Sequence, residues 1–95
     1  MTNKAHTTVL NRLLARYQGT SPPHNPIDVV AGDLQIAVET TATLNENLPE
    51  LLTLDGPIYI AVTNQESLTE ALRLTAGTKI GVMNSRGDIV QRAGE

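Results

Sequence analysis

The sequence contains no cysteine, phenylalanine or tryptophan, and Tyr17 and Tyr59 are its only aromatic residues. Without cysteine the chain cannot form a disulfide, a thiolate nucleophile or a cysteine-ligated zinc site. With so few aromatic rings, the hydrophobic core must be built from Leu, Ile, Val and Ala side chains. The missing cysteines fit a reducing compartment, and we therefore expect a cytoplasmic protein.

The chain also lacks an excess of positive charge and a long hydrophobic run. Seven Lys and Arg residues stand against ten Asp and Glu residues, which gives a formal net charge of −3. Because nucleic-acid binders usually gain much of their affinity from basic surfaces, this balance argues against strong non-specific binding of DNA or RNA, although it leaves room for a local basic patch. No apolar run approaches the roughly 20 residues of a membrane span, and the polar N-terminus does not resemble a secretory signal. We expect a soluble protein without a membrane partner.

Two common catalytic motifs are absent. The segment Gly77-Thr78-Lys79 lacks the leading glycine of a phosphate-binding loop and precedes an expected strand, not a helix. His6 and His24 do not lie near a serine nucleophile motif, so Ser–His–Asp catalysis has no support. His24 stands in a proline-rich loop, where it is either a solvated side chain or an accessory ligand or base beside acidic residues.

The residues that are present are organised around the segment 26–41. Two β-branched, apolar runs over residues 27–31 and 34–40 are joined at Gly32-Asp33. Runs of Val and Ile favour strands, and a glycine beside an aspartate tolerates the positive φ of a tight turn. This segment therefore predicts a β-hairpin over residues 27–40.

The segments on either side of the hairpin predict helices. Apolar residues that recur at helical spacing predict an amphipathic helix over residues 5–17, followed by a proline-rich loop over 18–26. Leucines at similar spacing predict a short helix over about 44–54, after a polar connection over 41–47. Pro49 must then lie in the first turn of that helix or divide it.

The C-terminal half predicts a βαβ unit over residues 58–83. Residues 58–63 form an apolar run that is typical of a strand buried on both faces. Asn64 is placed to cap a following helix over 66–76. A strand over 79–83, a turn at 84–88 and an edge strand over about 88–91 complete the chain.

Together these elements predict a single α/β domain over residues 1–95. Its sheet is mixed and five-stranded, with flanking helices and the element order α-β-β-α-β-α-β-β. The unit over 58–83 implies a right-handed parallel crossover.

Asp28 and Glu39 give the sharpest chemical signal in the sequence. They lie at the two ends of the expected hairpin strands that meet in an antiparallel pair. Two carboxylates at a sheet edge suit a hard divalent cation such as Mg²⁺ or Mn²⁺, with the backbone carbonyl of Thr40 as a third ligand. Such a metal activates bound water and stabilises charge on a phosphoryl oxygen. The alternative is that both acids are merely solvated.

Lys4, Arg12 and Arg16 give the first helix a small basic ridge. This ridge is either a solvated helix face or a surface that contacts the phosphates of a nucleic acid.

A family resemblance joins these features. The pattern Pro26-Ile27-Asp28, with Glu39 eleven residues later and then Thr40-Thr41, resembles the PD-(D/E)XK motif of nucleases. Its setting is similar as well, because a helix precedes the hairpin that carries both acids, and a helix and a further strand follow. Within that superfamily the chain looks most like small archaeal-type Holliday-junction resolvases and restriction-endonuclease-like proteins. The likeness extends to about Met83 and implies a restriction-endonuclease-like core that acts on DNA with Mg²⁺ or Mn²⁺.

The resemblance assigns roles position by position. Asp28 and Glu39 match the metal-binding acids of the family. The family's catalytic lysine, two residues after the glutamate, falls on Thr41, whose uncharged hydroxyl cannot replace an ammonium group. The first helix also lacks the glutamate that many relatives supply. Lys79 or Lys4 could compensate for the missing lysine from elsewhere in the fold.

Three functions remain open from the sequence. The first is a nuclease-fold protein that has lost catalysis and serves as a small interaction or assembly module, with a homodimer or another protein as its complex, because exposed sheet edges invite pairing. The second is a Mg²⁺-dependent DNA endonuclease or junction-resolving phosphodiesterase that uses Asp28 and Glu39. The third is an unrelated small α/β protein, in which these two acid side chains would lie far apart.

Overall fold

The structure, a computed structural model, describes residues 4–21 and 27–94. Three helices and five strands lie within these residues, in the predicted order. They are α1 (Lys4–Tyr17), β1 (Val29–Ala31), β2 (Leu34–Glu39), α2 (Thr41–Leu51), β3 (Ile58–Val62), α3 (Gln65–Thr75), β4 (Gly81–Met83) and β5 (Ile89–Gln91).

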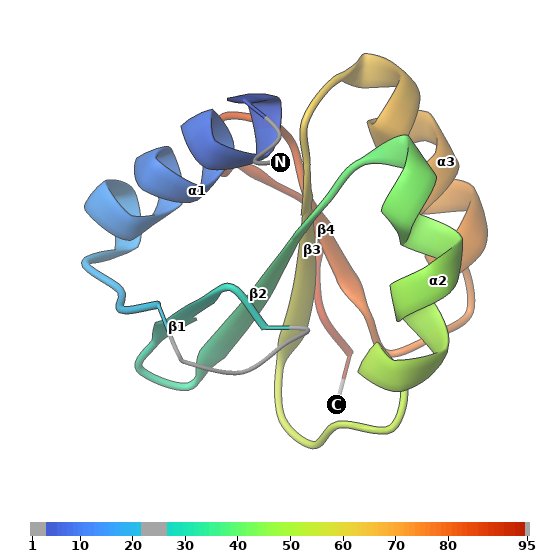
Figure 1. Cartoon of the computed structure of the whole chain (residues 1–95). Coiled ribbons are helices and arrows are strands. Elements are labelled where there is room, and N and C mark those ends of the chain that lie inside the picture. The colour runs from blue at the N-terminus through green and yellow to red at the C-terminus, as the bar shows by residue number, and fades with distance from the viewer. Residues whose placement is uncertain (1–3, 22–26, 95) are drawn as a thin grey trace.

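The five strands form one mixed sheet in the order β1-β2-β3-β4-β5. β1 and β2 are antiparallel, β2, β3 and β4 run parallel, and β5 returns antiparallel to β4. Figure 1 shows the sheet between α1 on one face and α2 and α3 on the other. The prediction of an α/β fold with a mixed five-stranded sheet and flanking helices is therefore confirmed.

The central strand β3 supplies hydrophobic side chains to both faces of the sheet. Ile58, Ile60 and Val62 belong to the cluster under α2 and α3. Tyr59 and Ala61 belong to the cluster under α1. Every residue of β3 is buried, as its uninterrupted apolar run predicts. Because no Phe or Trp is available, branched aliphatic side chains fill most of both clusters.

The predicted hairpin is present as β1 and β2. Its turn falls at Gly32-Asp33, and Gly32 has a φ of +61°, a conformation that glycine adopts without steric cost. Val29 pairs with Ile36 and Val30 pairs with Gln35. The carboxyl end of β2 is thereby placed beside the residues that precede β1.

The second helix begins earlier than predicted. α2 starts at Thr41, so the expected polar connection over residues 41–47 is helical, and Thr40 is the N-cap residue. The Thr43 hydroxyl accepts a hydrogen bond from the Thr40 backbone N–H at 2.9 Å, which stabilises the first turn. Pro49 lies in the last turn instead of the first, two residues before the helix ends.

The predicted cap of the third helix is confirmed. Asn64 precedes α3, and its Oδ1 accepts a hydrogen bond from the Ser67 backbone N–H at 2.7 Å. The strand predicted over residues 79–83 is shorter, because β4 begins only at Gly81. Thr78 forms a turn before it: its N–H donates to the Thr75 carbonyl, and its hydroxyl accepts from the Ile80 N–H.

The first helix ends at Tyr17 in a Schellman-type turn. Gln18 has a φ of +52°, and the Gly19 N–H donates to the Leu14 carbonyl at 3.1 Å. The residue in the left-handed conformation is therefore Gln18 and not the glycine after it. In the part of the chain that the structure describes, no helix combines the length and apolar character that crossing a membrane requires.

Candidate functional site

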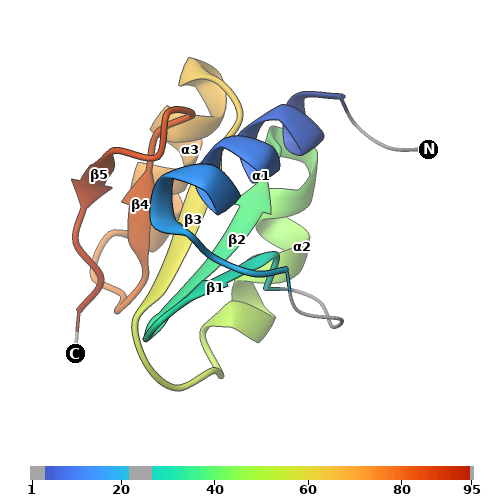
Figure 2. The ribbon, with the colours of Figure 1, turned by 90° about the vertical axis from the view of Figure 1, so that its left-hand side faces the viewer.

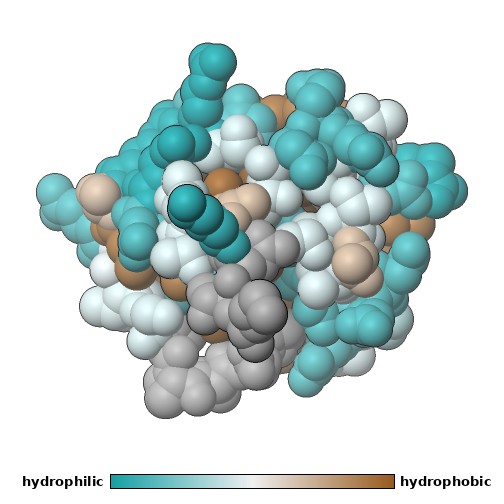
Figure 3. Space-filling model, turned by 45° about the horizontal axis from the view of Figure 1, so that its top comes forward, coloured by the Kyte–Doolittle hydropathy of each residue, from teal (hydrophilic) through white to brown (hydrophobic). Residues whose placement is uncertain are grey.

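The two acids predicted from the sequence lie together at the carboxyl end of β2. Glu39 is the last residue of β2, and Asp28 directly precedes β1. This is the end of the parallel strands at which open α/β sheets usually bind ligands. It lies at the top of Figure 1, and Figure 3 looks onto it: hydrophilic and neutral residues cover most of the visible surface, and hydrophobic areas are small.

Glu39 is enclosed by the first two turns of α2. Its residue surface is 2% exposed, and its Oε1 accepts a hydrogen bond from the Asn47 side chain at 2.8 Å. Burial raises the pKa of the Glu39 carboxyl, and the charge of Asp28 raises it further. Hydrogen bonds from the Thr43 and Asn47 side chains act in the opposite direction. Glu39 is therefore a carboxylate held by the protein itself.

Asp28 is less enclosed than Glu39. Its side chain is 20% exposed, and its Oδ2 accepts a hydrogen bond from the Val38 backbone N–H at 2.8 Å. The Nε2 of His6, from the first turn of α1, lies 3.7 Å from the same oxygen. Burial raises the pKa of the Asp28 carboxyl, and the Val38 N–H and His6 partly offset that effect. The two acids are thus neighbours, in contrast to the arrangement expected of an unrelated fold.

Thr40 and Thr41 are engaged in helix contacts. The Thr40 carbonyl, the expected third metal ligand, accepts hydrogen bonds from the backbone N–H groups of Thr43 and Leu44, both at 3.1 Å. Thr41 occupies the position of the motif lysine, but it lies on α2 and not on the strand. Its hydroxyl is 2.8 Å from the hydroxyl of Ser67 on α3. The backbone of α2 thus already uses the Thr40 carbonyl, and Thr41 contacts α3.

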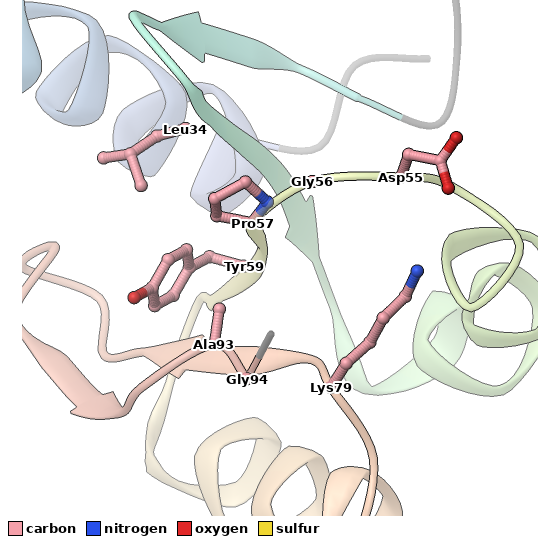
Figure 4. A pocket seen from close by; sticks show the side chains of 8 residues that line it. All are labelled: Leu34, Asp55, Gly56, Pro57, Tyr59, Lys79, Ala93 and Gly94. Carbon is pink, nitrogen blue, oxygen red and sulfur yellow. The ribbon is translucent and has the colours of Figure 1, made fainter.

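Lys79 does not approach the acids. Tyr59 pairs with Gly81, and Glu39 pairs with Val62, so Lys79 and Glu39 lie at opposite ends of β3. Five strand residues separate these levels, which is roughly 16 Å. The ammonium group of Lys79 donates a hydrogen bond to the Leu54 carbonyl. It lines a separate hollow of about 640 Å³, which Figure 4 shows together with the ring of Tyr59. Lys79 is therefore not a spatial substitute for the motif lysine.

Two of the three basic residues of α1 anchor the helix. Arg12 Nη1 donates to the Ser85 carbonyl at 2.7 Å. Arg16 Nη1 donates to the Arg86 carbonyl at 2.9 Å and to Asp88 Oδ1 at 2.7 Å. These bonds hold α1 against the turn between β4 and β5, so the predicted phosphate-contacting ridge is in large part a structural clamp.

Lys4 lies at the opposite end of α1 from Arg16. Together with Arg12, Thr63 and Ser85 it lines a shallow hollow of about 360 Å³ beside the carboxyl ends of β3 and β4. Thr8 lines it as well, so two cations and three hydroxyl residues make this hollow the part of the predicted ridge that can still receive an anion.

Metal binding has limited support in the geometry. Within residues 4–21 and 27–94, no group of three or more His, Cys, Asp or Glu side chains is arranged to hold a metal ion. Asp28 and Glu39 are the two carboxylates that could contribute to holding Mg²⁺ or Mn²⁺, and most of the remaining ligands would have to be water. His24, the candidate accessory ligand, and Pro26, the first residue of the motif, lie outside the described residues.

Three residues of the site were missed by sequence reasoning: His6, Thr43 and Asn47. Thr43 and Asn47 were assigned to a polar connection. The signal for them was the Thr40-x-x-Thr43 spacing, which is a capping pattern and starts a helix at residue 41. In that helix Thr43 and Asn47 are one turn apart and face the same side. His6 had no such signal, because 22 positions of sequence separate it from Asp28.

Comparison with known proteins gives no family assignment. No family model matches the chain, and no curated protein or solved structure matches it. The function is therefore inferred from the geometry of the described residues.

Proposed function

We propose that this protein is a nuclease-like α/β domain without hydrolytic activity, which serves as a small interaction or assembly module. The observation that carries the proposal is the enclosure of Glu39, which is 2% exposed and bonded to α2. A carboxylate that holds a catalytic metal must let that metal reach water and substrate. Glu39 offers little free surface for such a metal.

The surroundings of the acid pair support the same conclusion. The Thr40 carbonyl is occupied by the backbone of α2, and the Thr41 hydroxyl contacts Ser67. Lys79 lies at the other end of the sheet. Among the described residues, neither Thr41 nor Lys79 therefore supplies an ammonium group beside the acids. Without such a group, a water molecule at this site would lack the motif lysine's help in orienting it and in stabilising developing charge.

A second candidate is a Mg²⁺-dependent DNA endonuclease or junction-resolving phosphodiesterase. One observation favours it: the partly exposed Asp28 and the hollow lined by Lys4 and Arg12 lie at the same end of the sheet. His6, which contacts Asp28, is adjacent in sequence to Ala5, another lining residue of that hollow. An anionic backbone in the hollow would pass close to the acids.

Metal titration separates the two candidates. For a non-catalytic module, we expect no heat of binding when Mg²⁺ or Mn²⁺ is titrated to millimolar concentration. We also expect no cleavage of linear or branched DNA. Asp28→Asn is the matched variant, because an asparagine oxygen can still accept the Val38 N–H bond. Metal binding that disappears in Asp28→Asn, together with metal-dependent cleavage by the wild type, would instead establish the nuclease.

A stability measurement tests the enclosure of Glu39 directly. Glu39→Gln should raise the free energy of unfolding at pH 7 by about 0.5–2 kcal/mol. The glutamine keeps an acceptor for Asn47 and removes a buried charge. Glu46→Gln, at an exposed position of α2, is the control and should change little. If the protein is instead the Mg²⁺-dependent nuclease, Glu39→Gln should also abolish the binding of Mg²⁺ or Mn²⁺.

The contribution of Asp28 and Glu39 to the free energy of unfolding depends on pH with a defined sign. Because folding raises the pKa of Glu39 and of Asp28, folding favours their protonated forms. The resulting stability is present below the unfolded pKa values and is lost as the pH rises through the folded ones. The contribution of these two carboxyls to stability should therefore grow as the pH falls from 7 toward the ordinary pKa values of 3.8 for Asp28 and 4.5 for Glu39. In urea titrations at a series of pH values, Glu39→Gln should remove part of this gain.

A further inference from the structure

The fifth strand leaves one edge of the sheet open. β5 is the last strand of the sheet, and within residues 4–21 and 27–94 no other segment pairs with its outer side. Figure 2 shows β5 at the margin of the molecule, beyond β4. Ile89 and Val90 are each 45% exposed, more than any other large hydrophobic side chain described. An edge with free backbone groups and apolar side chains is a template for another strand.

The residues of β5 carry none of the usual side-chain protection of an edge. Ile89, Val90 and Gln91 include no charge and no proline. Ile89 pairs with Met83 and Gln91 pairs with Val82, so Val90 is an extra residue that forms a bulge opposite β4. Such a bulge can turn an edge away from partners. The bulge is the one protective feature of this short strand, and the two residues before and after the strand carry charges.

From these features we infer that β5 pairs with the β5 of a second copy of this chain, antiparallel and centred on Val90. This inference rests on the proposed function, since it names the partner that a non-catalytic module would bind. A two-fold axis at Val90 brings Asp88 of each copy opposite Arg92 of the other. It also brings Ile89 opposite Gln91. The pair would continue the sheet from one copy into the next.

Charge favours this register over its neighbours. An axis at Gln91 would place Asp88 opposite Gly94 and Arg92 opposite Val90, so neither charge would meet its opposite. An axis at Asp88 would oppose two carboxylates, and an axis at Arg92 would oppose two guanidinium groups. An axis at Ile89 would bring Arg86 opposite Arg92. With the axis at Val90, opposite charges meet twice, and like charges opposite each other are avoided. The carboxylate of Asp88 is half exposed even while it is bonded to Arg16, so it can accept a second cation.

The expected dimer is weak. Stable interfaces bury about 800 Å² per partner, and a three-residue strand such as β5 offers less. We therefore expect a reversible equilibrium between a monomer of 10.2 kDa and a dimer of twice that mass, with the dimer appearing as the protein concentration rises.

Sedimentation equilibrium over a wide range of protein concentration tests the pairing. Val90→Lys would place two ammonium groups at the axis and should weaken association at least about tenfold. Leu52→Lys is the matched control, because Leu52 is also an exposed hydrophobic residue, at 39%, but lies after α2 and far from β5 in sequence. It should leave association unchanged. A monomer at every concentration, or a dimer that Val90→Lys does not weaken, would overturn the inference.

Single cysteines report the register, because the native chain contains none. Under mild oxidation Val90→Cys should form a disulfide-linked dimer, since only a residue on the axis faces its own copy. Ile89→Cys should cross-link poorly alone and better when mixed with Gln91→Cys. Efficient cross-linking of Ile89→Cys alone, with none of Val90→Cys, would overturn the axis at Val90.

Failure of this inference can be distinguished from failure of the proposed function. A protein that stays monomeric and binds no metal refutes the pairing at β5 and leaves the non-catalytic module intact. A protein that dimerises through β5 and cleaves DNA with Mg²⁺ refutes the proposed function and leaves the pairing intact.

Discussion

The two edges of the sheet differ in how they end. At the β1 edge, Thr20 forms an isolated bridge to Val30: each residue's N–H donates to the other's carbonyl at 2.8 Å. At the β5 edge, no such bridge lies among the described residues, and Ile89 and Val90 are exposed. Thr20, soon after α1, therefore satisfies the outward backbone groups of Val30 in β1, whereas the described residues leave the outer side of β5 open.

The β5 edge is nevertheless firmly attached to the domain. Tyr17, at the end of α1, donates a hydrogen bond from its hydroxyl to the Gly87 carbonyl at 2.6 Å. Arg12 and Arg16 contact the same turn. The Gln91 side chain donates to the Ile80 carbonyl at 2.9 Å. Because the edge is held on its inner side and open on its outer side, the proposed pairing of two β5 strands would require little ordering of the chain.

The largest loss of stability is expected for Gly81→Ala in β4, the strand next to the open β5 edge. A Cβ at Gly81 would lie 2.5 Å from the ring of Tyr59 and 2.6 Å from the backbone nitrogen of Ala93. The backbone after β5 would have to move, and we expect a loss of about 3 kcal/mol in the free energy of unfolding. Chemical denaturation measures it.

Gly94→Ala is the control for that substitution. A Cβ there would make an ordinary contact of 3.4 Å with Lys79, so the change should be within about 1 kcal/mol of neutral. Equal losses in the two variants would show that the tight packing at Gly81 is not the cause.

The next largest loss of stability is expected for Gly19→Ala, beside the β1 edge that Thr20 bridges. A Cβ at Gly19 would lie 2.8 Å from Val29 Cγ1 and 2.9 Å from the Val30 carbonyl oxygen. We expect a loss of about 1–3 kcal/mol, with faster hydrogen exchange of the Val30 amide, which bonds to Thr20. An unchanged exchange rate at Val30 would contradict the assigned role of Thr20 in pairing with the outer side of β1.

Most helices and strands, including those at both edges of the sheet, could be predicted from the sequence. The element order and the hairpin at Gly32-Asp33 were predictable because period, β-branching and turn residues are local signals. The start of α2 was missed because Leu44 was taken as its first contact residue, although the cap lies at Thr40. Local patterns thus determined the elements and left the element boundaries uncertain.

The roles of the basic residues were not predictable from local patterns. Arg12 lies 73 positions from Ser85, and Arg16 lies 72 positions from Asp88. On the helix alone, both look like solvated or phosphate-binding cations. Only the packing of α1 beside the β4–β5 turn shows that they bind the protein itself. For the same reason, the enclosure of Glu39 by Asn47 could not be inferred from the spacing of the acids.

A smaller effect is expected from Tyr17→Phe, which removes the bond between α1 and the turn that leads into β5. The loss should be about 1 kcal/mol, since the ring keeps its contacts and only the hydroxyl is lost. Tyr59→Phe is the control: its hydroxyl makes no hydrogen bond to another residue in the described part of the chain. If both variants lose equal stability in thermal unfolding, the bond to Gly87 contributes nothing specific.

The smallest effect concerns the ion pair of Arg16 and Asp88, which is exposed to solvent. The hydrogen bond from Arg16 lowers the pKa of Asp88, and Asn84 lowers it further. A carboxyl whose pKa is lowered by folding stabilises the protein at pH values above its unfolded pKa. That stabilisation is lost as the pH falls through the folded pKa. The stability difference between wild type and Arg16→Gln should therefore shrink as the pH falls from 7 to about 3. Asp88→Asn should remove most of this pH dependence while leaving the bond from Arg16 to the Arg86 carbonyl. A difference that is constant across this range would show that the carbonyl bond, and not the carboxylate, is what Arg16 contributes to holding the β5 edge.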